Sequence, residues 1–170
     1  MASIFPNAIN RAGILSSARE RTNIRYSKVY EQYSQRIYSL AFWMTDNELV
    51  ASELASGTFL RAFSNPENPG TEEIDKAFLT EVRHYTPVGT LTLSAVAGPD
   101  THSIRGNVKR VHLERAVVQL PATEKLIFLL HDVEGYEHDR IGRLLGLSVE
   151  ECQLGLHQAR VCIRQTLATM

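Results

Sequence analysis

The feature that most constrains this 170-residue chain is a short helical pattern, a glycine and a second helical pattern near its C-terminal end. The first pattern covers residues 137–145 and places Ile141 on its inward face. Gly146 then permits the left-handed backbone that a tight turn between two helices needs. Ser148 begins the second pattern, and Glu151 follows three residues later, which is the spacing of a capping box. The sequence therefore predicts a helix-turn-helix, whose second helix enters the major groove of DNA.

The charge balance argues against a broad electropositive surface. The net charge is -1, from 18 basic and 19 acidic residues, whereas a dedicated DNA binder has a basic excess. Cys152 and Cys162 stand ten positions apart on one predicted helix, too far for a disulfide, and indicate a reduced, cytoplasmic protein. No apolar run suits a membrane span and no secretory signal is evident, so no membrane insertion is expected.

Residues 27–85 carry apolar side chains at three- and four-residue steps, in three successive stretches. Asp46 or Asn47 is suited to cap the second stretch, and the prolines and glycine of residues 64–70 end it. The third stretch is expected to run from Glu72 to His84. Residues 27–85 therefore predict a three-helix bundle.

The predicted fold is all-α, with two small helical domains joined by a flexible linker. Residues 86–107 are rich in glycine, proline, threonine and serine, which is typical of a linker, and residues 108–170 form the second domain. Residues 1–26 are an N-terminal extension with four arginines. Two interpretations stay open for it: a basic arm that touches nucleic acid, or a frayed, partly helical segment.

More specific patterns lie within both halves of the chain. In the C-terminal half they cover residues 129–136, 141–149 and 156–160, and these runs closely resemble region 4 of extracytoplasmic-function sigma factors. Those proteins are small two-domain initiation subunits of bacterial RNA polymerase. Residues 33–41 and 58–63 look like the opening helices of region 2 of the same family. The resemblance covers most of the chain and implies no enzymatic activity.

The resemblance also implies partners and contact residues. The expected partners are the clamp coiled coil of core RNA polymerase, promoter DNA and an anti-sigma factor. Residues that match the polymerase-binding helix are Glu53, Ser56, Phe59 and Arg61. Residues that match the DNA-binding module are Arg140, Arg143, Ser148, Gln153, His157, Arg160 and Arg164.

Some positions depart from the family pattern. Basic residues are usual where this chain has Gln153, Gly155 and Gln158, and Glu150 adds a carboxylate at the start of the same helix. Each lost cation removes roughly one counterion's worth of salt-dependent DNA affinity. In region 2, a glutamine-glutamate pair is replaced by Ser56 and Gly57. These departures predict weakened DNA and polymerase contacts.

The sequence contains no catalytic constellation, no phosphate-binding glycine loop and no nucleophile motif. His131 and His138 flank Gly135 and could meet, but two histidines without a third ligand make a poor metal site. We therefore expect no enzyme, no cofactor and no metal ion.

The leading hypothesis is a sigma-type protein that binds core polymerase and promoter DNA. The alternative is a sigma-like decoy, which keeps the fold so that an anti-sigma factor binds it and has no need of DNA. A plain helix-turn-helix repressor leaves the N-terminal half unexplained.

Overall fold

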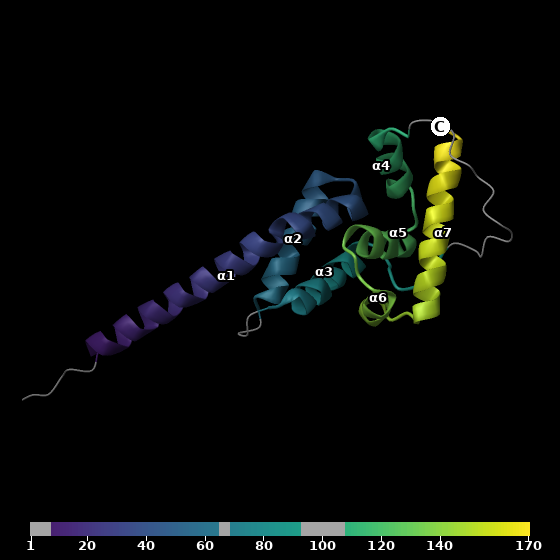
Figure 1. The fold of residues 1–170 in the computed structure, drawn as a ribbon. Helices are drawn as coiled ribbons and strands as arrows, with labels where there is room; N and C mark the ends of the chain where they lie inside the picture. The colour runs from purple at the N-terminus through teal and green to yellow at the C-terminus, as the bar shows by residue number, and fades with distance from the viewer. Residues whose placement is uncertain (1–7, 65–68, 93–107) are drawn as a thin grey trace, which may run out of the picture.

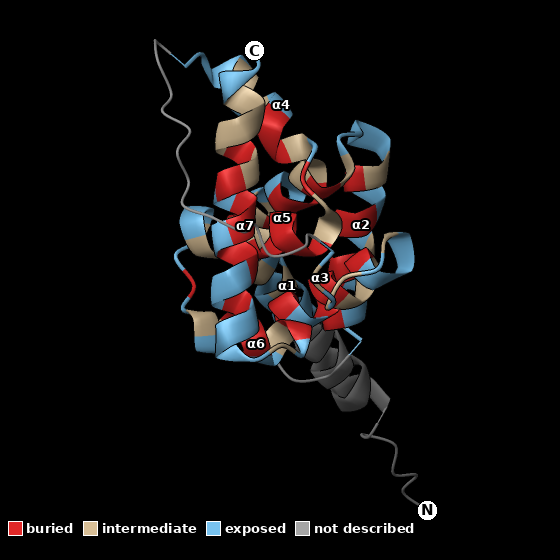
Figure 2. Cartoon of the chain, turned by 90° about the vertical axis from the view of Figure 1, so that its right-hand side faces the viewer, coloured by how far each residue is buried: buried red, intermediate tan, exposed pale blue. Residues whose placement is uncertain are grey.

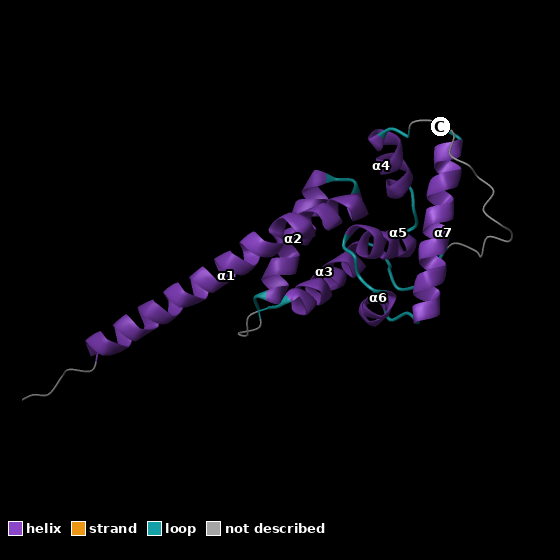
Figure 3. Cartoon of the chain, in the orientation of Figure 1, coloured by secondary structure: helices purple, strands orange, loops and turns teal. Residues whose placement is uncertain are grey.

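The computed structural model describes residues 8–64, 69–92 and 108–170, with side chains from residue 20 onward. Every regular element in these ranges is helical (Figure 3), which confirms the all-α prediction. None of the described helices combines the length and apolar character that a membrane crossing requires. The start of the predicted extension, residues 1–7, and most of the predicted linker, residues 93–107, lie outside the described residues.

The N-terminal half contains α1 (Ala8–Thr45), α2 (Glu48–Ala62) and α3 (Thr71–Tyr85). Asn47 caps α2, because its Oδ1 accepts hydrogen bonds from the backbone N–H groups of the second and third residues that follow it, at 3.0 and 3.1 Å. The helix α1 begins nineteen residues earlier than the expected start at Ser27, and residues 8–26 contain no proline to stop it. Its N-terminal half extends away from the rest of the molecule (Figure 1).

The C-terminal half has five helical elements: α4 (Arg110–Val118), α5 (Ala122–Phe128), η1 (Leu129–Val133), α6 (His138–Leu145) and α7 (Val149–Ala168). Three of them, α4, α5 and α6, pack against α7. Figure 2 shows that the buried faces of these helices turn toward one another. Cys152, Leu156, Ala159 and Ile163 are buried on α7.

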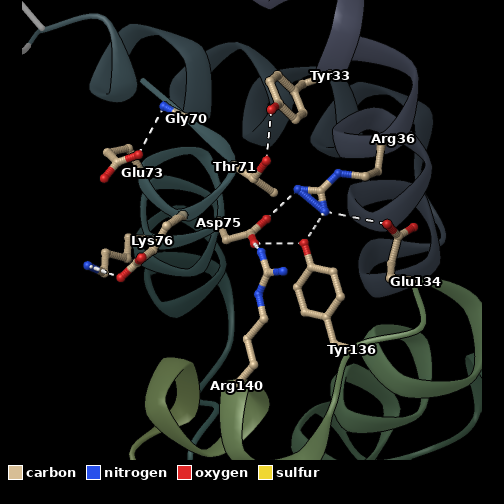
Figure 4. Close-up of polar contacts among 11 residues, drawn as sticks. Tyr33, Arg36, Gly70, Thr71, Glu73, Asp75, Lys76, Glu134, Tyr136 and Arg140 are labelled. Carbon is tan, nitrogen blue, oxygen red and sulfur yellow. Dashed lines mark hydrogen bonds and ion pairs between the residues drawn. The ribbon is translucent and has the colours of Figure 1, made fainter. Parts of the chain in front are cut away.

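One turn of π-helix, η1, continues α5. The backbone N–H of Glu134 donates to the carbonyl of Leu129 at 3.0 Å, and that of Tyr136 to the carbonyl of Leu130 at 2.9 Å. Gly135 has a φ of 72°, a conformation that a residue without a Cβ adopts at little cost. After the widened turn and the glycine, Glu134 points toward Arg36 of α1 and Tyr136 toward Asp75 of α3 (Figure 4).

The two halves are in contact, and residues 86–92 join them closely. The backbone N–H of Gly89 donates to Oγ1 of Thr123 at 3.2 Å, and that of Thr92 to Oε1 of Glu124 at 2.6 Å. Glu124 is fully buried. The first part of the predicted linker is therefore docked on α5.

Candidate functional site

The turn between α6 and α7 has the geometry that the glycine pattern predicts. Gly146 adopts a left-handed conformation with a φ of 76°, and its N–H donates to the carbonyl of Gly142 at 2.8 Å. A Cβ on Gly142 would lie 2.5 Å from the carbonyl oxygen of Leu147, so the close approach of the turn to α6 requires a glycine there. Both glycines serve the helix-turn-helix.

The predicted capping box at the start of α7 is confirmed. The Ser148 hydroxyl accepts from the N–H of Glu151 at 3.0 Å, and the Glu151 carboxylate accepts from the N–H of Ser148 at 2.8 Å. The predicted DNA contact Ser148 therefore has its hydroxyl committed to the cap. The helix N-terminus, which attracts phosphate, also carries the exposed carboxylate of Glu150.

Two predicted DNA contacts, Gln153 and His157, lie four residues apart on the exposed side of α7. Leu154 is also exposed there, at 42%. This face presents one amide and one imidazole, and the exposed Arg160 follows them one turn further along the helix.

The arginines that were predicted to contact DNA have different partners in the structure. Arg143 is exposed and pairs with Asp139 of its own helix at 2.6 Å. Arg160 donates twice to Asp132, at 3.0 and 2.6 Å, and Arg164 is half-buried. Exposed pairs of this kind are weak because solvent screens them, so a phosphate can compete for Arg143 and Arg160. Arg140 is different, because it turns toward α3.

Two departures from the family pattern prove to be unrelated to the exposed face of α7. Gly155 is buried, and a Cβ there would lie 2.7 Å from side-chain atoms of both Ile127 and Leu91. Gln158 is 1% exposed, and neither its Nε2 nor its Oε1 has a hydrogen-bond partner among the described residues. Both positions are therefore buried, because α4, α5 and α6 cover a wide face of α7, and whether they weaken DNA contact stays a prediction.

The predicted polymerase contacts lie on α2. Glu53, Ser56 and Arg61 are exposed, and Ser56 helps to line a groove between α1 and α2. Phe59 is only 4% exposed and packs against Tyr30, with ring centroids 4.8 Å apart. Phe59 therefore packs between α2 and α1, and its ring is not exposed to a partner.

The replacement at Gly57 also has a local explanation. Arg61 pairs with Glu81 of α3 at 2.7 Å, and a Cβ on Gly57 would lie 2.8 Å from that same carboxylate. A glutamate at position 57 would bring a second carboxylate against Glu81. The glycine therefore leaves room for the ion pair between α2 and α3.

An interdomain polar cluster joins the two halves of the molecule (Figure 4); its members are Arg36, Asp75, Glu134, Tyr136 and Arg140. Oδ1 of Asp75 pairs with Arg36 of α1, and its Oδ2 accepts from the Tyr136 hydroxyl and from Arg140, both at 2.7 Å. Arg36 also donates to the Tyr136 hydroxyl at 2.7 Å and lies 3.4 Å from Glu134. The Arg140 guanidinium sits 3.7 Å from the centre of the Tyr136 ring.

Burial shapes the ionisation of this cluster. Burial, together with the hydrogen bond to Asp75, raises the pKa of Tyr136 far above its ordinary value. Burial also raises the pKa of Glu134, against the opposing charge of Arg36. The Tyr136 hydroxyl therefore keeps its proton at neutral pH and donates it to Asp75 in a hydrogen bond.

Sequence reasoning missed this cluster, although one signal was present. Asp75 precedes Leu79 by four residues and Val82 by seven, which places a carboxylate on the predicted apolar stripe of α3. A carboxylate is almost never fully buried without a partner. The stripe itself therefore indicated a cation from elsewhere in the chain, without identifying which.

The two histidines that flank Gly135 do meet. The rings of His131 and His138 lie 4.5 Å apart, and Nδ1 of His131 is 2.8 Å from Asp132. In the described parts of the chain no three histidine, cysteine or carboxylate side chains gather as a metal site.

Known proteins share the sequence pattern of the C-terminal half and the arrangement of the whole. Residues 110–163 match the family model described as sigma-70, region 4. The chain is 26% identical to the ECF RNA polymerase sigma factor SigE of Mycolicibacterium smegmatis over 161 residues, which cover 84% of this chain and 62% of SigE. It is 21% identical to the RNA polymerase sigma factor YlaC of Bacillus subtilis over 156 residues, 82% of this chain and 90% of YlaC.

Among solved structures, the fold is similar to that of the sigma factor RpoE from Bartonella quintana, which was crystallised with the anti-sigma factor NepR. The TM-score is 0.58 with 13% sequence identity, and the match covers 84% of this chain and 96% of that one. The chain thus resembles extracytoplasmic-function sigma factors in sequence and in fold, as its motifs indicated.

Proposed function

We propose that this chain is a sigma-type initiation subunit, which binds core RNA polymerase and directs it to promoter DNA. The observation that carries the proposal is the capped helix-turn-helix of α6 and α7, which follows the α1–α3 bundle in the order that the resemblance to sigma factors implies. The protein would act in the cytoplasm and catalyse nothing by itself. An anti-sigma factor is a further expected partner.

In this function the α2 face would bind the clamp coiled coil of the polymerase. Glu53, Ser56 and Arg61 offer a carboxylate, a hydroxyl and a guanidinium to that partner, while buried Phe59 fixes the helix that carries them. The promoter would be read by α7. A polymerase that holds the chain at the promoter raises its effective concentration, so a weakly charged reading helix is tolerable.

Two positions on the exposed face of α7 still lack the family's charge. Gln153 replaces a lysine, and Glu150 places a carboxylate where phosphate would approach. Because Gly155 and Gln158 are buried, they do not add to this deficit. The structure thus supports a smaller loss of DNA affinity than the sequence predicts.

A second candidate function is a sigma-like decoy that binds an anti-sigma factor without binding DNA. The combination of exposed Leu154 with Glu150 at the start of α7 favours it, because an apolar and acidic face suits a protein partner better than phosphate.

Reconstitution with bacterial core polymerase tests the proposal. We expect co-elution with core and promoter-specific transcripts, and we expect Glu53→Lys to weaken the complex about tenfold. The matched control is Glu20→Lys, the same charge reversal on the exposed part of α1. A chain that neither binds core nor supports initiation, yet binds an anti-sigma protein tightly, would be the decoy.

A further inference from the structure

We propose that the exposed side of α1 carries a docking site for the phosphate backbone of duplex DNA. The site is a row of three exposed cations, Arg21, Arg25 and Lys28, which we call the cation row. The identity of the DNA partner rests on the proposed function. The placement of the row rests on the structure alone.

The three cations share one face of α1. They stand four and three residues apart, so successive turns of the helix place them one above the other. At about 1.5 Å of rise per residue, the row from Arg21 to Lys28 covers about 10 Å of helix axis. One strand of duplex DNA carries a phosphate about every 3.4 Å along the duplex axis. The row therefore presents three positive charges over the length of about three phosphates.

The cation row faces away from the body of the molecule. On the other side of α1, the Tyr26 ring stacks on Phe63 of α2 with centroids 4.6 Å apart, and the Tyr30 ring lies 4.8 Å from that of Phe59. At about 100° of rotation per residue, these two tyrosines lie roughly 150° around the helix from the row. The N-terminal half of α1 also extends from the body (Figure 1), so the row is accessible to a partner as large as duplex DNA.

The cations of the row have no hydrogen-bond or ion-pair partner among the described residues. By contrast, Arg61, Arg110 and Arg143 on other exposed faces pair with carboxylates at 2.7, 2.5 and 2.6 Å. The acidic residues of the same stretch of α1, Glu20 and Glu31, lie about 90° around the helix from the row. A phosphate that binds the row therefore displaces no existing ion pair.

Duplex DNA is the partner that these charges favour. With a net charge of -1, the affinity of this chain for phosphates has to come from local groups of cations. The exposed face of α7 supplies few of them, since Gln153 and His157 carry no fixed charge and Arg160 is already paired with Asp132. Phosphate contacts carry no sequence information, but they fix a protein on the duplex. The row adds affinity and orientation to the reading of sequence by α7.

The salt dependence of duplex binding tests the row, because each phosphate contact contributes about 0.9 to the slope of log affinity against log salt concentration. The variant is Arg21→Gln with Arg25→Gln, and its first control, Arg21→Lys with Arg25→Lys, keeps both charges in place. The second control, Lys109→Gln with Arg115→Gln, removes two exposed cations at α4. The probe is a labelled random-sequence duplex, and circular dichroism establishes that each protein is folded.

We expect Arg21→Gln with Arg25→Gln to make the slope shallower by about two and to weaken duplex binding about tenfold at low salt, while both controls bind like the parent. A slope equal to that of the parent would overturn the proposal. An equal loss in the α4 control would also overturn it, because net charge alone would then explain the result. Weaker binding to core polymerase with an unchanged slope would assign the row to a protein partner instead of DNA.

The proposed function is measured separately, by co-elution with core polymerase and by promoter-specific transcripts. If the parent supports transcripts and the slope does not change in the variant, the cation row is not a DNA contact and the proposed function stands. If the parent binds no duplex, with or without core, and supports no transcript, both proposals are wrong.

Discussion

Two arginines on α6, three residues apart, differ in their exposure and in the partner they pair with. Arg143 is 71% exposed and pairs with Asp139 of its own helix, whereas Arg140 is 35% exposed and pairs with Asp75 of the other domain. Gln153 and Gln158 of α7 divide in the same way, since Gln153 is exposed and Gln158 is buried. The outward members face solvent, while Arg140 joins α6 to α3 and Gln158 is buried within the C-terminal half.

The largest difference should appear between Asp75, the carboxylate that pairs with Arg140, and Asp139, the carboxylate that pairs with Arg143. Asp75→Ala leaves Arg36, whose side chain is 18% exposed, without its main counterion, and should lower the free energy of unfolding by about 3 kcal/mol. Asp139→Ala removes an exposed partner and should leave the free energy of unfolding nearly unchanged, because solvent screens that ion pair. Urea unfolding of both variants measures the contrast, and equal losses would contradict it.

Adding basic residues to the exposed face of α7 should strengthen DNA binding. Glu150→Lys with Gln153→Lys should strengthen duplex DNA binding about tenfold at low salt and steepen its salt dependence by about two counterions, because each lysine can reach a phosphate. Glu48→Lys with Leu49→Lys, an exposed pair on α2, makes the same charge change elsewhere. No gain over that control in a mobility-shift assay would show that this face does not meet DNA.

Removing a buried polar group from α7 should stabilise the fold. Gln158→Leu removes a buried amide that has no partner among the described residues, and should raise the free energy of unfolding by about 1 kcal/mol. Gln153→Leu, on the exposed side, should change it by less than about 0.5 kcal/mol. Thermal unfolding compares the two, and a destabilised Gln158→Leu protein would mean that its amide has a role in the fold.

The smallest effect concerns Asp132, which pairs with Arg160 near the outer face. Burial raises the pKa of Asp132, but hydrogen bonds from Arg160 and His131 outweigh it, so the pKa lies below its ordinary value. A carboxyl whose folded pKa is lowered stabilises the fold above its unfolded pKa, about pH 4, and this stabilisation disappears as pH falls through the folded pKa. Asp132→Asn should therefore lose stability slightly at neutral pH and show a shallower decline below about pH 4. A melting curve with the same acid decline as the parent would exclude this contribution.

Local features of the fold were predictable from sequence because they depend on neighbouring residues. The capping box of Ser148 and Glu151, the left-handed Gly146 and the cap at Asn47 each need only a few consecutive residues, and all are confirmed. The start of α1 was placed too late because an apolar stripe identifies the packed part of a helix. The part of α1 that extends beyond the body has no such requirement.

The candidate site was less predictable, because it depends on which helices pack against one another. A stripe of Cys152, Leu156, Ala159 and Ile163 predicts one buried face for α7, but three helices pack on it and also cover Gly155 and Gln158. Comparison with a family pattern took these two residues for lost DNA contacts. The pairing of Asp75 with Arg140, 65 residues away, leaves no periodic trace in the sequence. The predicted polymerase and DNA contacts stay predictions until they are measured.

The π-helical turn η1 has a consequence for how this architecture can vary. A π turn holds one more residue than the α-helical turn it replaces, and each residue of an α-helix rotates the chain by about 100°. The π turn takes up that extra residue, so the chain beyond it keeps nearly the direction that an ordinary turn would give it. Deleting a single residue between Leu129 and Val133 would therefore restore an ordinary helix with Tyr136 still facing Asp75, whereas the same deletion within α6 would rotate the residues that follow it by about 100°.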